Sequence, residues 1–60
     1  MDKYSYAVDF GRNLYTQTCY CMADSVDEVR QRAIDGFGLA DRKPDSYTIM
    51  IYNHTTKTNY

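Results

Sequence analysis

Residues 4–10 of the chain read YSYAVDF, and large apolar side chains alternate there with small or acidic ones. In an extended strand, the even positions of this stretch face one side and the odd positions face the other. The pattern therefore predicts a strand with one apolar face that must be buried. In a chain of only 60 residues, the cover for that face has to come from the one amphipathic helix that the sequence offers.

The helix is predicted to begin after Ser25. Glu28 stands three residues later, which is the pattern of a capping box, in which each side chain bonds to the other residue's backbone N–H. The apolar residues that follow form one stripe at helical spacing, namely Val26, Val29, Ala33 and Phe37 with Ile34 beside it. We expect Gly38 to be the left-handed residue after the helix, because Leu39 can then contact Ile34.

Two further strands are expected on either side of the helix. Residues 14–23 follow a turn at residues 11–13, and residues 47–53 read YTIMIYN after a polar loop around Pro44. The predicted fold is α+β with β-β-α-β topology, in which a three-stranded antiparallel sheet of order 2-1-3 carries the helix on one face. We expect residues 1–60 to form a single small domain whose residues 55–60 are a frayed tail.

The length of the first turn decides which face of the sheet carries Cys19 and Cys21. A two-residue turn, at either Gly11-Arg12 or Arg12-Asn13, places both cysteines on the same face as Tyr4, whereas a three-residue loop turns the strand over. We expect the even-length turn, and hence two small cysteine side chains buried under the helix.

Neither cysteine is predicted to take part in metal or redox chemistry. Two residues one position apart in a strand have parallel side chains with Cα atoms about 6.5–7 Å apart, at the limit of disulfide reach. A closed zinc site needs about four ligands, and the only other soft ligand is the distant His54. We therefore expect no metal and no other cofactor.

The opposite face of the sheet has nothing left in the chain to cover it. Its central strand offers the small residues Ser5 and Ala7 between larger neighbours, so a shallow groove is expected there. The predicted protein-binding residues are the anchors Tyr20, Met22, Met50 and Tyr52, with Arg12, Arg42 and Lys43 as a polar rim. The interface would serve a protein partner or a second copy of the chain.

A second hypothesis is that the exposed tyrosines stack on the bases of single-stranded nucleic acid. The net charge is only −1, and in this interpretation the open face carries Asp9 and no Lys or Arg. Without a basic surface, affinity for phosphates is weak, so protein binding is the favoured hypothesis.

No arrangement of nucleophile, base and acid is visible, and His54 stands alone near the end of the chain, so we expect a protein that is not an enzyme. The opening residues MDKYSYAVDF lack the apolar core of a secretion signal, and no apolar run approaches the roughly 20 residues that span a membrane. The expected location is the cytoplasm, without membrane association.

Three stretches of the chain resemble parts of short single-domain proteins of bacteriophages and mobile elements. They are YSYAVDFGRNLYTQT, ADSVDEVRQRA and YTIMIYN, which together span most of the sequence but contain no catalytic or ligand-binding motif. The resemblance implies an inhibitor of a host protein, similar in size to anti-CRISPR proteins, that acts by occluding its partner's site, often as a homodimer. A phage-encoded chain would work in the host cytoplasm.

Overall fold

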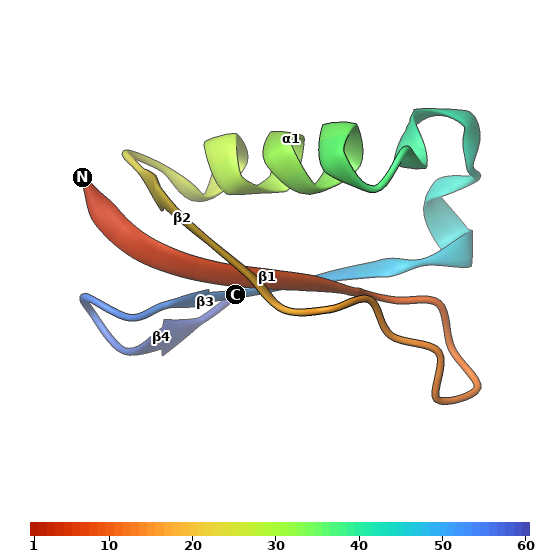
Figure 1. The fold of residues 1–60 in the computed structure, drawn as a ribbon, viewed down its shortest axis with the longest axis horizontal. Helices are drawn as coiled ribbons and strands as arrows, with labels where there is room; N and C mark the ends of the chain where they lie inside the picture. Colours follow the sequence, from red (N-terminus) through yellow and green to blue (C-terminus); the bar gives the residue numbers. More distant parts are fainter.

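The computed structural model describes residues 1–60 as four strands and one α-helix. The elements are β1 (Asp2–Asp9), β2 (Cys19–Ala23), α1 (Val26–Gly36), β3 (Thr48–Asn53) and β4 (Thr58–Asn59). Two short 3-10 helices, Leu39–Asp41 and Pro44–Ser46, connect α1 to β3. The sheet is antiparallel in the order β2-β1-β3-β4, and α1 lies along one of its faces (Figure 1). The α+β class and the single covering helix are thus confirmed.

The expected frayed tail at residues 55–60 is wrong, and the sheet has four strands instead of three. The buried side chain of Asn53 causes the difference, because its Oδ1 accepts hydrogen bonds from the N–H groups of Thr55 (2.8 Å) and Thr56 (3.0 Å). Lys57 then adopts a left-handed conformation with φ of 58°. This four-residue loop returns the chain so that Thr58 lies opposite Asn53 in the β3–β4 pair.

The β1–β2 hairpin contains two deviations from the expected turn that cancel each other. Phe10 and Leu14 close a three-residue loop in which residues 11–13 all have positive φ angles. The N–H of Thr16 donates to the carbonyl of Val8 at 2.9 Å, but Cys19 lies opposite Tyr6. One extra residue therefore sits in the second arm between these two pairs, which is a β-bulge.

The three-residue loop reverses which face of the sheet each side chain of the second arm occupies, and the extra residue of the bulge reverses it again. Cys19 and Cys21 consequently lie opposite Tyr6 and Tyr4, on the helix side of the sheet as expected. Both are only half-buried rather than fully enclosed, because β2 is an edge strand with no neighbour on its outer side. Both are free thiols.

The expected start and end of the helix are confirmed. Ser25 Oγ accepts the N–H of Glu28 at 3.3 Å, although the Glu28 carboxylate accepts from the N–H of Asp24 rather than from that of Ser25. Gly38 has a left-handed conformation with φ of 65° and ψ of 41°. The chain can then turn immediately and bury Leu39 beneath the end of α1, since the first 3-10 helix packs against α1.

The core lies between α1 and the helix side of the sheet. Its central cluster consists of Tyr4, Ala23, Val29 and Ile51. The ring of Tyr6 packs edge-on against that of Phe37, with 6.1 Å between their centroids, and so extends the core toward the end of α1. All of the core therefore lies on one side of the sheet, and the other side is left without a covering element (Figure 1).

Candidate functional site

The face of the sheet opposite α1, here called the open face, carries the largest exposed apolar side chains of the strands. Tyr20 is 62% exposed, Met22 50% and Met50 36%. Tyr20 and Tyr52 lie opposite Ser5 on its two sides, while Met50 lies opposite Ala7. The structure thus brings the four predicted anchors, Tyr20, Met22, Met50 and Tyr52, onto one face around the small residues of β1.

A groove with a volume of about 320 Å³ runs over the centre of this face. Ser5 and Ala7 are among its lining residues although they are only 9% and 7% exposed, because larger side chains flank them on both sides. Met50 and Tyr52 contribute the β3 side. The far wall comes from Asn59 and Tyr60, which the sequence pattern places in a frayed tail.

His54 joins the open face, which the sequence did not predict. Its Nε2 lies 2.8 Å from Ser5 Oγ, and its ring packs edge-on against Tyr52 at a centroid distance of 4.7 Å. The ring of Tyr20 lies on another side at 5.7 Å. Because the segment after β3 folds back instead of fraying, His54 is held over β1 by its own N–H, which donates to the carbonyl of Lys3 at 2.8 Å.

Lys3 also belongs to the open face, so the expectation of a face without Lys or Arg is wrong. β1 begins at Asp2, two residues earlier than the sequence pattern suggested, and the alternation therefore places Lys3 on the same side as Ser5. Its Nζ lies 5.5 Å from the centre of the Tyr20 ring, in a cation–π contact.

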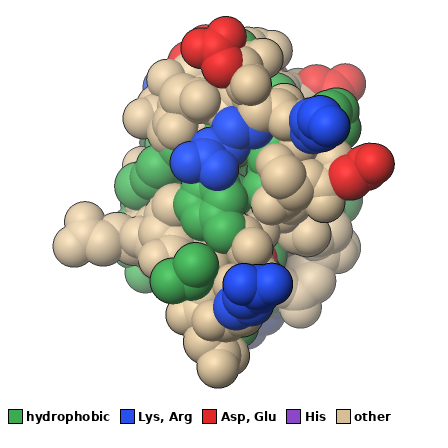
Figure 2. Space-filling view, turned by 90° about the vertical axis from the view of Figure 1, so that its right-hand side faces the viewer, with side chains coloured by type: hydrophobic (Ala, Val, Ile, Leu, Met, Phe, Trp, Pro, Cys, Tyr) green, Lys and Arg blue, Asp and Glu red, His purple; other side chains and the backbone are tan.

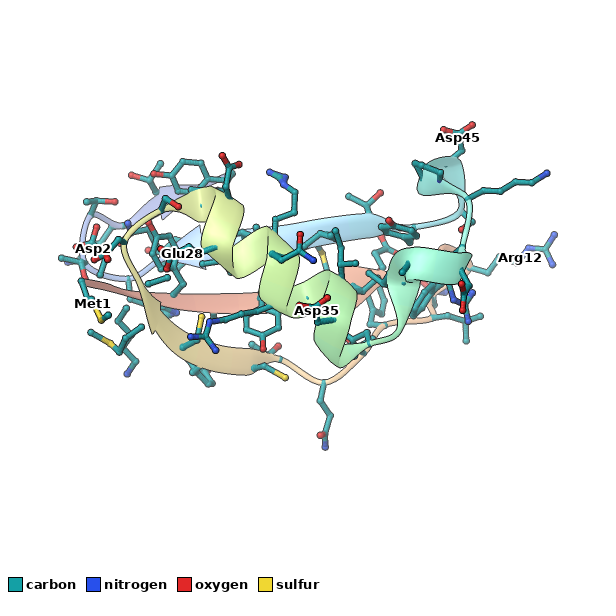
Figure 3. The ribbon with its side chains drawn as sticks, turned by 90° about the horizontal axis from the view of Figure 1, so that it is seen from above. Met1, Asp2, Arg12, Glu28, Asp35 and Asp45 are labelled. Carbon is teal, nitrogen blue, oxygen red and sulfur yellow. The ribbon has the colours of Figure 1, made fainter.

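The predicted rim residues do not surround these anchors. Arg12 is in the loop beyond the far end of β1, and Figure 3 shows it at the opposite end of the molecule from Met1 and Asp2. Arg42 lies 4.7 Å from the centre of the Phe10 ring near the same loop. Figure 2 shows that this end presents several Lys or Arg side chains around apolar atoms, which makes it a separate surface. The exposed Lys43 follows Arg42 directly in the chain, so it belongs with this end rather than with the open face.

Burial raises the pKa of three weak acids on the helix side of the sheet, namely Tyr4, Tyr6 and Cys21. For Tyr4, the charges of Asp2 and Tyr60 raise the pKa further. The thiol of Cys21 is also affected by Arg32, which lowers its pKa. These three groups stay protonated at neutral pH, so Cys21 is a poor nucleophile there.

Stability is expected to fall in alkaline solution because of these phenols. A group whose pKa is higher in the folded protein than its ordinary value, 10.0 for Tyr4, stabilises the fold fully below that value and loses this contribution as the pH rises above it. Urea denaturation between neutral pH and pH 11 should therefore show that the free energy of unfolding declines with pH, and that it declines less steeply for Tyr4→Phe than for the unmodified chain. The exposed Tyr15 provides the matched control, and Tyr15→Phe should leave the decline unchanged.

No cluster of three or more His, Cys, Asp or Glu residues is close enough to hold a metal ion. Nor does any helix have the length and hydropathy that crossing a membrane requires. Searches of known families, characterised proteins and solved structures find no match to this chain.

Proposed function

We propose that this chain is a small non-catalytic protein-binding module that acts through the open face of its sheet. The observation that carries the proposal is the exposure of Tyr20, Met22 and Met50 on one face around a groove. Interfaces are enriched in Tyr and Met relative to the rest of the protein surface, and methionine side chains adapt their shape to a partner.

The groove favours a partner that inserts one apolar side chain. Ala7 and the side chains of Met50 and Tyr52 offer apolar contacts, while Ser5 and Thr18 provide hydroxyl groups for the partner's backbone. An anchor that fills a pocket at the centre of an interface, surrounded by contacts that exclude water, is the arrangement in which single residues contribute most to binding.

The Ser5–His54 pair does not alter this proposal. A serine nucleophile needs hydrogen-bond donors nearby, commonly backbone N–H groups, to stabilise the oxyanion that forms during acyl transfer. Ser5 lies in the middle of the central strand, between β2 and β3, where backbone N–H groups are used by the sheet. The pair is better explained as a hydrogen bond that fixes the His54 ring between Tyr20 and Tyr52.

The resemblance to short phage proteins extends the proposal to an inhibitor that covers a site on a host protein in the host cytoplasm. The size of the chain and an interface made of side-chain contacts alone support this role. The exposed apolar side chains of the open face support occlusion because they can cover a site on a partner.

Single-stranded nucleic acid remains a second candidate because of one observation. Lys3 lies over the Tyr20 ring on the open face and supplies a cation beside rings that could stack on bases. Binding of this kind weakens steeply with salt, whereas insertion of an apolar side chain into the groove does not. Titration with oligonucleotides at low and at high salt separates the two.

Alanine substitution at Tyr20 tests the proposed interface. Peptides selected from a random displayed library against the immobilised chain should map to the open face by NMR. Tyr20→Ala should weaken their binding by about 30-fold, which corresponds to about 2 kcal/mol for an aromatic anchor. Tyr15→Ala is the matched control, because Tyr15 is 58% exposed and lies at the base of the hairpin loop instead.

Equal loss of affinity in the two variants, or selected peptides that bind only the end of the molecule near Arg12, would contradict the proposal. Oligonucleotide binding that is lost in Tyr20→Ala and falls with salt would replace it with the second candidate.

A further inference from the structure

The outer edge of β2 is the feature of the fold that remains unexplained. β2 stands at the end of the sheet order, and its five residues, CYCMA, contain no charge, proline or glycine. Natural proteins usually protect edge strands with charged residues, proline or bulges, or make the edges short, because an unprotected edge pairs readily with another strand. Here the bulge near Gln17 precedes β2 and leaves its five residues in regular pairing with β1. The opposite edge follows this rule, since β4 consists of only two polar residues, Thr58 and Asn59.

The hydrogen bonds of β1 identify which backbone groups at the β2 edge are free. On the β3 side, the carbonyl of Lys3 accepts from the N–H of His54; on the β2 side, the carbonyl of Val8 accepts from the N–H of Thr16. Backbone groups of successive residues in an antiparallel strand point to alternate edges. The even-numbered residues of β1 therefore bond toward β2, and the odd-numbered residues bond toward β3.

Tyr4, an even-numbered residue, lies opposite Cys21, so Cys21 uses its N–H and carbonyl groups within the sheet. Tyr20 and Met22, on either side of Cys21, must then point theirs away from the molecule. The edge thus presents two N–H and two carbonyl groups in a row, beside two exposed side chains on the open face.

We infer that β2 pairs antiparallel with β2 of a second copy of this chain, about a two-fold axis at Cys21, to form one continuous eight-stranded sheet. This register is the one that pairs all five residues of the strand. It places Tyr20 opposite Met22 of the partner subunit, and these two residues exchange both of their outward backbone hydrogen bonds. The two-fold axis repeats the exchange, so four hydrogen bonds join the copies.

The side chains on both faces fit this register. On the open face, each Tyr20 ring lies beside the methionine of the opposite strand, a favourable sulfur–aromatic contact that occurs twice. On the helix face, the register places the small side chains of Cys21 and of Cys21 of the partner subunit beside each other, so no bulky side chain opposes the pairing there.

This pairing uses the edge of the sheet and leaves the groove free. The two open faces become neighbours in one sheet, which gives a dimer with two adjacent copies of the groove. The inference does not depend on the proposed function, because it rests on the backbone of β2 and not on what the groove binds.

Proline at position 22 tests the role of the backbone. The N–H of Met22 bonds to nothing within the chain, so Met22→Pro removes only the bond to the second copy, and edge strands tolerate proline at such a position. Met22→Ala is the matched control, since it removes the same side chain but keeps the N–H. Sedimentation equilibrium should show a dimer dissociation constant about 30-fold higher for the proline variant than for the alanine variant, because two hydrogen bonds are lost per dimer. Circular dichroism and NMR spectra establish that both variants fold.

Oxidative cross-linking tests the position of the axis. Cys21 and Cys21 of the partner subunit would form a non-hydrogen-bonded pair with Cα atoms about 4.5 Å apart, within the range of a disulfide. Diamide, which takes two electrons and two protons from a pair of thiols, should therefore link Cys19→Ala into dimers at mildly alkaline pH. Cys21→Ala should remain unlinked, because Cys19 faces Ala23 of the partner subunit in this register.

A chain that stays monomeric from micromolar to millimolar concentration would overturn the inference and would leave the edge to a strand of another protein. Equal dissociation constants for the proline and alanine variants, or equal cross-linking of the two cysteine variants, would overturn it as well. Peptide binding by Tyr20→Ala and Tyr15→Ala is measured at a chain concentration at which both variants are monomeric, so failure of the dimer and failure of the proposed groove are distinguishable.

Discussion

Replacement of Leu39 by alanine is expected to lower the free energy of unfolding by about 3 kcal/mol. Leu39 is 1% exposed and is among the largest fully buried side chains of the chain. It lies directly after the left-handed Gly38, where the first 3-10 helix packs against α1, so its removal leaves a cavity at the end of the core. A domain of this size gains only about 3–5 kcal/mol from its core, so the loss is comparable with the whole stability.

Leu14 provides a control of the same residue type. It is 60% exposed beside the hairpin loop, and Leu14→Ala should change the free energy of unfolding by less than about 0.5 kcal/mol. Urea denaturation followed by circular dichroism measures both variants. If Leu39→Ala leaves too little folded protein to titrate, Leu39→Met keeps the volume and should cost less than about 1.5 kcal/mol. Similar costs for Leu39→Ala and Leu14→Ala would mean that Leu39 contributes little to the core.

The helix and its cover of β1 could be predicted from the sequence because local signals and the core requirement agree. Ser25 and Glu28 mark its start, Gly38 marks its end, and the stripe between them contains Val29 and Ala33, which are fully buried. Each of these features depends on residues within a few positions of one another, which is the range over which sequence patterns are informative.

The orientation of β2 was predicted correctly for a reason that the sequence did not reveal. The turn has three residues, which by itself would have placed Cys19 and Cys21 on the open face. The bulge near Gln17 reverses the effect, and nothing in the polar stretch around it distinguishes a bulge from regular pairing. What decides the outcome is the core, because only this orientation puts Ala23 and Cys21 under α1.

The residues of the open face that the sequence did not predict have a common explanation. Both ends of the chain are more ordered than the local sequence pattern indicates. Lys3 lies outside the alternating stretch YSYAVDF but continues its strand, and His54 follows the last apolar strand but folds back over Ser5. Polar residues give no periodic hydrophobic signal. Their positions are set by hydrogen bonds to residues about 50 positions away, such as that of Asn53 to Asp2.

Replacement of Asn53 by alanine is expected to release the last strand and to cost about 2–3 kcal/mol. Asn53 is 2% exposed, and its Nδ2 donates to Asp2 Oδ2 at 3.0 Å while its Oδ1 accepts from Thr55 and Thr56. Alanine leaves these partners without their bonds and removes the constraint that forms the loop. Hydrogen exchange should show loss of protection at the N–H of Tyr60, which otherwise donates to the carbonyl of Ile51 at 2.9 Å.

Asn59→Ala is the matched control for stability and for protection at Tyr60, because Asn59 is an exposed asparagine in the same hairpin and its replacement should cost less than about 0.5 kcal/mol. It is not a control for peptide binding, since Asn59 lines the groove. The effect of Asn53→Ala should extend to the groove, although the Asn53 side chain makes none of the contacts of the open face. Release of the hairpin removes the wall formed by Asn59 and Tyr60 and frees His54 from Ser5, so peptides selected for the open face should bind more weakly. If protection at Tyr60 and peptide binding both survived in Asn53→Ala, backbone pairing alone would hold β4. The groove would then owe its shape to the sheet and not to this buried amide.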